Sequence, residues 1–188
     1  MPASPLPVLQ TPRLALRPMT VADTDAVYKM IATSRDSFAR WFGWARESTR
    51  ESVQEYVQQA SDAATIGSAW HYVVRTRPGS LIARIGLTQI DTVNFSAELG
   101  YMMRTDFEGS GLMTEAALAL LSYALDAGGL HRITAYADVE NVGSQKVLAR
   151  LGFRHEGTAR HMLHLPERGW RDHHAYGLLE GELRGGRR

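Results

Sequence analysis

The sequence predicts a single α/β domain, with a mixed, mostly antiparallel central sheet and helices on both of its faces. Strand-like and helix-like runs alternate along the chain in the order β, helices, βββ, α, β, α, ββ, which favours one mixed sheet. The chain has 188 residues, a length that suits one domain. Hydrophobic residues make up 44% of the chain and charged residues 22%, enough for a substantial core. We expect a loose, proline-rich arm over residues 1–12, the domain over 13–183, and a basic, disordered tail over 184–188.

The first half of the domain is predicted to hold one strand, then helices, then three strands. Residues 13–19 alternate between apolar and polar, as a strand does. A helix over 22–32 follows, with Thr20 or Asp23 as its N-cap, and Thr49 begins a further helix. An antiparallel meander is expected next, over the runs 69–76, 80–90 and 95–105.

The second half is predicted to alternate helices and strands. A helix over 112–127 carries its apolar residues in two adjacent rows. A buried strand over 131–139 and a helix from Asn141 to its stop at Gly152 come next. A closing hairpin turns at residues 166–169.

Composition excludes several kinds of site and partner. The net charge of +1 gives no electrostatic reason to expect nucleic-acid or membrane binding. The chain has no cysteine, so it has no disulfide, cysteine nucleophile or thiolate metal site, and it fits a reducing, cytoplasmic compartment. No run approaches the roughly 20 apolar residues of a membrane span, and the start of the chain lacks the apolar region of a secretory signal.

Gly109 and Gly111 lie between a predicted strand and a predicted helix, in the stretch DFEGSGLMTEA. A helix N-terminus has unpaired N–H groups and partial positive charge, and glycine lets an anion approach the backbone closely. The alternative is a tight strand-to-helix turn with no ligand. The spacing does not match G-x-x-x-x-G-K-S/T, and a dinucleotide fingerprint would need glycine where the chain has Thr114.

This stretch resembles the pyrophosphate loop of the GCN5-related N-acetyltransferases (GNAT), Q/R-x-x-G-x-G/A. The first position is held by Asp106, a departure that puts a carboxylate near the expected phosphates, so we expect Asp106 to point away. The resemblance implies the acyl-CoA N-acyltransferase fold, acetyl-CoA as acetyl donor and no metal. It also implies that the cofactor is bound by Phe107, Glu108, Gly109, Ser110, Gly111, Leu112, Met113 and Thr114.

Further motifs resemble the RimJ/RimL-type branch, which acetylates the N-termini of ribosomal proteins. They are ELGYMM, TEA, HRITAYADVEN and NVGSQKVLARLGFRHEG, and the similarity runs over about residues 11–183. The resemblance implies transfer of acetyl to a primary amine, such as a protein N-terminus. The alternatives are a small amine (an aminoglycoside, polyamine or amino acid) and a non-catalytic protein that only binds coenzyme A. A homodimer is expected from family similarity alone.

Glu98 is the candidate general base. The resemblance implies a glutamate base in this strand, and glutamate is unusual in an apolar strand. Alternation places Leu99 and Tyr101 on the opposite face. The alternative is an outward, solvated glutamate. The resemblance also implies that backbone N–H groups of Met102 and Met103 bond the pantetheine arm and polarise the thioester carbonyl.

Ser144 is the candidate general acid, which would protonate the departing thiolate. Many members of the wider superfamily use tyrosine, and the helix that begins at Asn141 offers none. Asn141 would bond the pantetheine arm. The alternative is that Asn141 is only an N-cap and Ser144 an ordinary residue of the first turn.

Two further groups are weighed as sites. Four aromatic residues crowd one short segment, and Phe38, Trp41 and Trp44 are candidates for the acceptor cleft; the alternative is that this cluster, which includes Phe42, belongs to the core. The pairs His161 and His164, and His173 and His174, lie on strands at odd spacings. Each pair is therefore expected on opposite faces, and no metal site is predicted.

Overall fold

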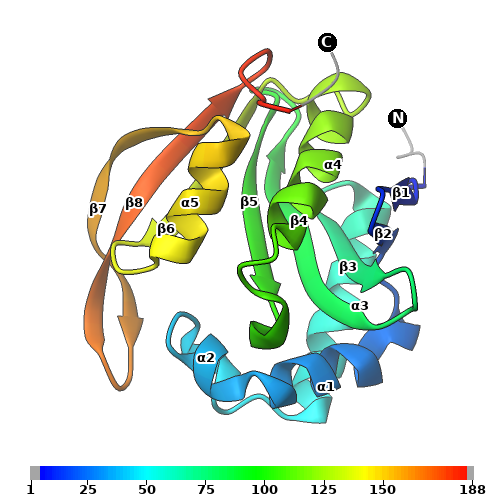
Figure 1. Ribbon diagram of the computed structural model, residues 1–188, viewed down its shortest axis with the longest axis vertical. Coiled ribbons are helices and arrows are strands. Elements are labelled where there is room, and N and C mark those ends of the chain that lie inside the picture. The colour runs from blue at the N-terminus through cyan, green and yellow to red at the C-terminus, as the bar shows by residue number, and fades with distance from the viewer. Residues whose placement is uncertain (1–4, 186–188) are drawn as a thin grey trace.

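The structure, a computed structural model, describes residues 5–185 and contains one eight-stranded sheet in the order β1-β2-β3-β4-β5-β6-β8-β7 (Figure 1). Neighbouring strands are antiparallel except β5 and β6, which are parallel. The strands are β1 (Leu9–Gln10), β2 (Leu14–Pro18), β3 (Trp70–Thr76), β4 (Leu81–Asp91), β5 (Ser96–Met103), β6 (Arg132–Asp138), β7 (Arg154–Leu165) and β8 (Gly169–Leu179). The mixed, mostly antiparallel sheet that the sequence predicts is confirmed.

Helices cover both faces of the sheet. The α-helices are α1 (Thr24–Thr33), α2 (Arg35–Ala39), α3 (Arg50–Ile66), α4 (Leu112–Asp126) and α5 (Val142–Leu151). Short 3-10 helices are η1 (Val21–Asp23), η2 (Gly43–Ala45) and η3 (Thr105–Phe107). One core lies between the sheet and α4 and α5, and a second lies between the sheet and α1 to α3. None of the helices in the described range is both long enough and apolar enough to cross a membrane.

The expected helix boundaries hold where a cap or a stop defines them. Thr49 caps α3 and accepts a hydrogen bond from the Ser52 amide, and Gly152 ends α5 with φ 101°. Both apolar rows of α4 are buried: Leu112, Met113, Ala116, Ala117, Leu120, Leu121, Ala124 and Leu125. The expected helix over 22–32 begins as η1, and only then continues as α1 from Thr24.

The two ends of the chain differ from the expectation of loose segments. Leu9 and Gln10 pair with β2, so the arm expected over 1–12 is fixed to the sheet edge at these residues. Near the other end, the Arg184 amide donates to the carbonyl of Leu151 at 3.0 Å, which ties the first residue of the expected tail to α5. Residues 186–188 of that tail lie outside the described residues, as do residues 1–4 of the arm.

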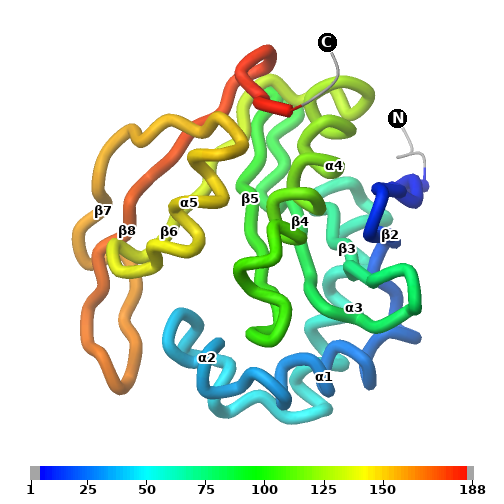
Figure 2. Tube along the Cα trace, viewed as in Figure 1, coloured from blue at the N-terminus to red at the C-terminus, as the bar shows by residue number. Residues whose placement is uncertain are grey.

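The sheet opens between β5 and β6. These strands pair only from Ser96 and Arg132 to Leu99 and Ala135, while β6 stays paired with β8 as far as Asp138. Beyond Leu99, β6 therefore follows β8 away from β5, and the two traces diverge (Figures 1 and 2). This opening defines where a ligand can enter the sheet.

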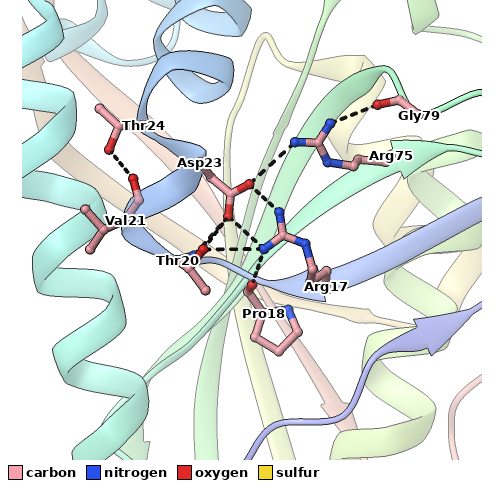
Figure 3. A network of polar contacts seen from close by, with 8 residues as sticks. All are labelled: Arg17, Pro18, Thr20, Val21, Asp23, Thr24, Arg75 and Gly79. Atoms are coloured by element: carbon pink, nitrogen blue, oxygen red, sulfur yellow. Dashed lines mark hydrogen bonds and ion pairs between the residues drawn. The ribbon is translucent and has the colours of Figure 1, made fainter.

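A buried carboxylate fixes the entry of the chain into α1. Asp23 is 2% exposed and pairs with Arg17 and, at 3.5 Å, with Arg75 (Figure 3). It also accepts a 3.0 Å hydrogen bond from the Thr20 amide. Burial alone would raise the pKa of Asp23, but the hydrogen bonds from Arg17 and Thr20 outweigh it and hold the pKa below its usual value.

We expect Asp23→Ala to lower the free energy of unfolding at pH 7 by about 3 kcal/mol, because it leaves two guanidinium groups without their shared partner. A lowered folded pKa stabilises the protein above the unfolded pKa of about 3.9, and this contribution is lost as pH falls through the folded pKa. Urea unfolding should therefore show a smaller difference in the free energy of unfolding between the wild type and Asp23→Ala at about pH 3 than at pH 7.

Asp25→Ala is the matched control, because Asp25 pairs with Arg50 at the surface and is 78% exposed. It should cost less than about 1 kcal/mol. Equal losses in the two variants would contradict the role assigned to Asp23.

Candidate active site

A cavity of about 740 Å³ occupies the opening between β5 and β6. Its walls come from α2 and the loop after it, β5, the glycine turn, the first turn of α4, β6 and α5. Most of the expected site residues line it: Phe38, Trp41, Glu98, Met102, Met103, Phe107, Glu108, Gly109, Gly111, Leu112, Met113, Thr114, Asn141 and Ser144. Two do not. Ser110 turns its hydroxyl back to the Phe107 carbonyl, and Trp44 lines a separate, smaller cavity.

The glycine turn has a backbone that other residues rarely adopt. Gly109 has φ 73° and Gly111 has φ 77°, both in the left-handed region. The turn alone therefore accounts for both glycines, as the ligand-free alternative requires. A Cβ built on Gly109 would meet no atom of the described residues within 4 Å, so the backbone there is also open to close approach.

The N-terminus of α4 fits an anion. Gly111 is its N-cap and supplies no side-chain cap, and the first helical hydrogen bond runs from the Glu115 amide to the Gly111 carbonyl at 3.1 Å. The amides of Leu112 to Thr114 therefore lack helical partners. Thr114 adds a buried hydroxyl with no hydrogen-bond partner among the described residues. Unpaired donors at the positive end of a helix are what a phosphate group binds.

Asp106 does not reach this anion site. Arg104 holds its carboxylate with hydrogen bonds of 3.0 Å and 2.6 Å, and Asp106 does not line the cavity, as expected. Glu108 does line it, and burial raises the pKa of its carboxyl group. The departure at the first loop position therefore leaves the cradle itself free of the Asp106 carboxylate.

Glu98 is half-buried on β5 and faces the side of the sheet covered by α1 to α3. It pairs in register with Thr88, and Leu99 and Tyr101 point to the other face, into the core under α4 and α5. Its carboxylate accepts a 3.3 Å hydrogen bond from Gln89, and no ion pair reaches it within the described residues. Burial raises the pKa of Glu98, so a freely solvated glutamate is not what the fold presents.

Ser144 lies at the other side of the opening, in the first turn of α5. The Asn141 side chain accepts a 3.0 Å hydrogen bond from the Ser144 amide, so Asn141 is the N-cap of α5. The Ser144 hydroxyl also lies 2.8 Å from the Tyr101 hydroxyl. Burial raises the pKa of Tyr101 to about 12, against the opposing effect of this hydrogen bond.

Comparison with known proteins identifies the family. The family described as the acetyltransferase (GNAT) domain matches residues 13–154. The chain belongs to the GNAT acetyltransferase family. YdaF of Bacillus subtilis (strain 168), provisionally described as a ribosomal N-acetyltransferase, is 30% identical over 158 residues, 81% of this chain and 84% of YdaF.

Two further relatives belong to the RimJ/RimL group. The ribosomal-protein-serine acetyltransferase of Escherichia coli (strain K12) is 27% identical over 139 residues, 71% of this chain and 75% of the relative. RimJ of Mycobacterium smegmatis, solved in complex with CoA-disulfide, has a TM-score of 0.85 and 25% identity, with 96% of this chain and 89% of RimJ covered. The RimJ/RimL-type resemblance read from the motifs is confirmed.

The aromatic segment of this GNAT chain divides between core and cavity. Phe38 is 3% exposed and belongs to the core under α1 to α3, as the alternative requires, although it also reaches the main cavity. Trp41 lines that cavity beside two guanidinium groups, of Arg40 at 4.9 Å and Arg168 at 5.5 Å. Trp44 instead walls the smaller cavity, of about 390 Å³.

The histidine pairs do not form a ligand set in the described part of the chain, where no group of three or more His, Asp or Glu side chains could hold a metal. The expectation that each pair lies on opposite faces of its strand is nevertheless wrong for His161 and His164. A bulge in β7 gives His161 φ 51°, and both His161 and His164 lie against the Trp170 ring, at 6.1 Å and 5.2 Å. Alternation fails across a bulge because an extra residue shifts the faces.

Two site residues were not foreseen. Tyr101, on β5, reaches the Ser144 hydroxyl on α5. Its odd spacing from Glu98 placed it on the opposite face of the strand, but nothing in the sequence indicated the contact with Ser144. Gln89 reaches Glu98 because β4 bulges after Thr88, where Gln89 takes φ 51°. Bulges of this kind re-aim side chains beside active sites.

A double-mutant cycle tests the contact between Tyr101 and Ser144. Tyr101→Phe and Ser144→Ala each remove one hydroxyl of a half-buried hydrogen bond, so the double variant should cost about 1 kcal/mol less than the sum of the single losses. Chemical unfolding of the four proteins measures this. Losses that add within about 0.3 kcal/mol would mean that the two hydroxyls are not coupled.

Proposed function

We propose that the protein acetylates the N-terminal α-amino group of a protein, such as a ribosomal protein, with acetyl-CoA as donor. Glu98 acts as general base and Ser144 as general acid. The observation that carries the proposal is that one cavity, opened by the separation of β5 and β6, is lined by both of these side chains and by an uncapped helix N-terminus. Support also comes from the descriptions of YdaF and of the E. coli relative, which name ribosomal acetyltransferase activity.

The fold offers the donor a place along the opening. Acetyl-CoA is the acetyl donor of GNAT enzymes. Backbone amides over residues 107–113 would hold its diphosphate, with the Thr114 hydroxyl as a further donor.

Backbone groups of Met103 face β6 beyond the last strand pair and would bond the pantetheine arm and the thioester carbonyl. Those of Met102 face β4, because the Arg104 amide donates to the Ile82 carbonyl and Met102 pairs with Arg84 in the same register. Met102 would therefore meet the ligand only through its side chain, which lines the cavity.

Proton transfer needs one acceptor and one donor. A free α-amino group has a pKa of about 7.7–8.0, so part of it is charged at neutral pH and must lose a proton before it attacks the thioester carbon. Glu98 accepts that proton, directly or through a water molecule. Ser144 donates a proton to the sulfur as the carbon–sulfur bond breaks, and its hydrogen bond to Tyr101 orients the hydroxyl.

The acceptor class is tested by a panel of amines, read by release of the coenzyme A thiol. The panel holds peptides with ribosomal-protein N-termini, aminoglycosides, polyamines and free amino acids. Turnover of the peptides is the expected result. If only a small amine is acetylated, the acceptor is that amine and not a protein N-terminus. If coenzyme A binds and no amine is acetylated, the protein only binds coenzyme A.

We expect Glu98→Gln to lower kcat about 100-fold, because the amide cannot accept a proton. In the wild type, kcat should also fall on the acid side as pH drops through the raised pKa of Glu98, since only the ionised carboxylate is a base. The variant should lack that acid limb in a pH profile of kcat.

Glu108→Gln is the matched control, because Glu108 lines the same cavity and burial raises its pKa in the same direction. It should change the KM for acetyl-CoA and keep the acid limb of kcat. If the limb disappears in Glu108→Gln and persists in Glu98→Gln, the base is assigned to the wrong glutamate.

Thr114→Val tests the anion cradle. The Thr114 hydroxyl has no partner among the described residues, so its loss should change the free energy of unfolding by less than about 0.5 kcal/mol. The Kd for coenzyme A, measured by calorimetry, should rise about tenfold through the loss of a hydrogen bond to a charged group.

Thr134→Val should show the reverse pattern, because its hydroxyl donates to the Ala97 carbonyl at 3.3 Å and does not line the cavity. We expect it to cost about 1 kcal/mol of stability and to leave the Kd unchanged. Unchanged affinity in Thr114→Val would remove this residue from the cradle.

A further inference from the structure

A second cavity, of about 390 Å³, lies between α1, α3, η2 and β4. Its walls are mostly apolar or aromatic, and they include Ile31, Val53, Trp44 and Tyr56. One guanidinium group, that of Arg84 on β4, projects among them. A cation in apolar surroundings requires a partner, because burying an unpaired charge is costly.

Arg84 has no carboxylate partner in the described part of the chain. Its Nε donates to the Met102 sulfur at 2.8 Å, and one of its terminal nitrogens donates to the Tyr56 hydroxyl. A guanidinium carries five N–H donors, so these two bonds leave three without a partner among residues 5–185. By contrast, Arg17, Arg104 and Arg171 each bind a carboxylate.

The surroundings hold the guanidinium in place for a ligand. It lies 4.7 Å from the centre of the Tyr56 ring and 5.5 Å from that of Trp44. The Tyr56 hydroxyl lies 3.3 Å from His71 Nδ1, and burial, aided by the charge of Arg84, lowers the pKa of His71 to about 4. His71 is therefore neutral at pH 7, and Arg84 carries the positive charge of this group.

The second cavity adjoins the main one on the face of the sheet that carries Glu98. Arg84 pairs in register with Met102, which lines the main cavity, and Glu98 lies four residues back along the same strand. At about 3.3 Å per residue, this places the two positions about 13 Å apart along β5. Gly100 lies between them, and a Cβ built on it would meet no described atom within 4 Å. The surface of β5 between the two positions is therefore open.

We infer that Arg84 binds a carboxylate of the acceptor while the acceptor amine lies at Glu98. This inference rests on the proposed acetyltransferase function and specifies its acceptor. The separation of about 13 Å corresponds to three or four residues of extended peptide, so the carboxylate belongs to an acidic side chain near the peptide N-terminus. A polyamine or aminoglycoside would instead bring further positive charge toward an uncompensated cation.

Glu47 is the acidic residue that shares this cavity with Arg84. It is exposed, and no described basic group lies within ion-pair distance of it. It lies at the rim, where water screens its repulsion of an entering carboxylate. Glu47→Gln should therefore keep or strengthen any preference for acidic acceptors.

The test uses two matched pairs of acceptors with the whole 188-residue chain. One pair is a peptide amide with glutamate at position three or four and the same peptide with glutamine there. The other pair is a free amino acid and its amide, which tests whether the carboxylate comes from the amino acid itself. We expect kcat/KM to favour the glutamate peptide about tenfold, the size expected for one charge-assisted contact.

Arg84→Met should abolish this preference, so that kcat/KM for the glutamate peptide and for the glutamine peptide agree within about twofold in this variant. Arg84→Lys should keep part of the preference, because the cation remains while the planar fork is lost. Arg160→Met is the charge-matched control, because Arg160 is exposed on β7 and lines neither cavity. It should keep the wild-type preference.

The outcomes separate this inference from the proposed function. Equal turnover of the glutamate and glutamine peptides by the wild type would overturn the role of Arg84 and leave the acetyltransferase proposal standing. A preference for the free amino acid over its amide without one for the glutamate peptide would overturn it too, because an α-carboxylate cannot lie about 13 Å from its own amine. A preference for the acidic member that survives in Arg84→Met would also overturn it. Coenzyme A binding without acetylation of any acceptor would overturn the proposed function, and the inference would fall with it.

Discussion

The early end of the pairing between β5 and β6 is the constraint on which the site depends. β5 is held by β4 as far as Met103, and β6 is held by β8 as far as Asp138, but the two strands pair with each other only as far as Leu99 and Ala135. Backbone groups that face the opening therefore lack a strand partner, and buried backbone groups must be satisfied by water or a ligand. A ligand with amide groups can enter as a short extra strand.

The opening also brings together side chains from the two faces of the sheet. On β5, Glu98, Gly100 and Met102 point toward α1 to α3, whereas Leu99, Tyr101 and Met103 point toward α4 and α5. In a continuous sheet the backbone would separate these two sets. Where β6 has moved away, the Glu98 carboxylate from one face and the Ser144 hydroxyl, bonded to Tyr101 from the other, line one cavity.

Periodicity and capping residues predicted most of the fold, because their causes are local. The two rows of α4, the Thr49 cap and the Gly152 stop each follow from a few neighbouring residues. The features that could not be predicted join distant parts or break the period. Tyr101 meets Ser144 across 43 positions, and the bulge that aims Gln89 at Glu98 depends on how β4 pairs, which no local pattern encodes.

Ion pairing divides the carboxylates of the main cavity into two kinds. Arg171 binds Asp138 at 2.8 Å and Glu140 at 2.6 Å. Burial alone would raise the pKa of Asp138, but its hydrogen bonds, chiefly from Arg171, outweigh burial and hold the pKa below its usual value. The hydrogen bond from Arg171 also lowers the pKa of Glu140. Glu98 and Glu108 receive no such partner within the described residues, and burial raises the pKa of both. A carboxylate neutralised by arginine is a weak base, so the distribution of arginines favours these two glutamates over Asp138 and Glu140 for proton removal. Of the two, Glu108 belongs to the glycine turn beside the anion site, whereas Glu98 lies on β5 across the opening from Ser144.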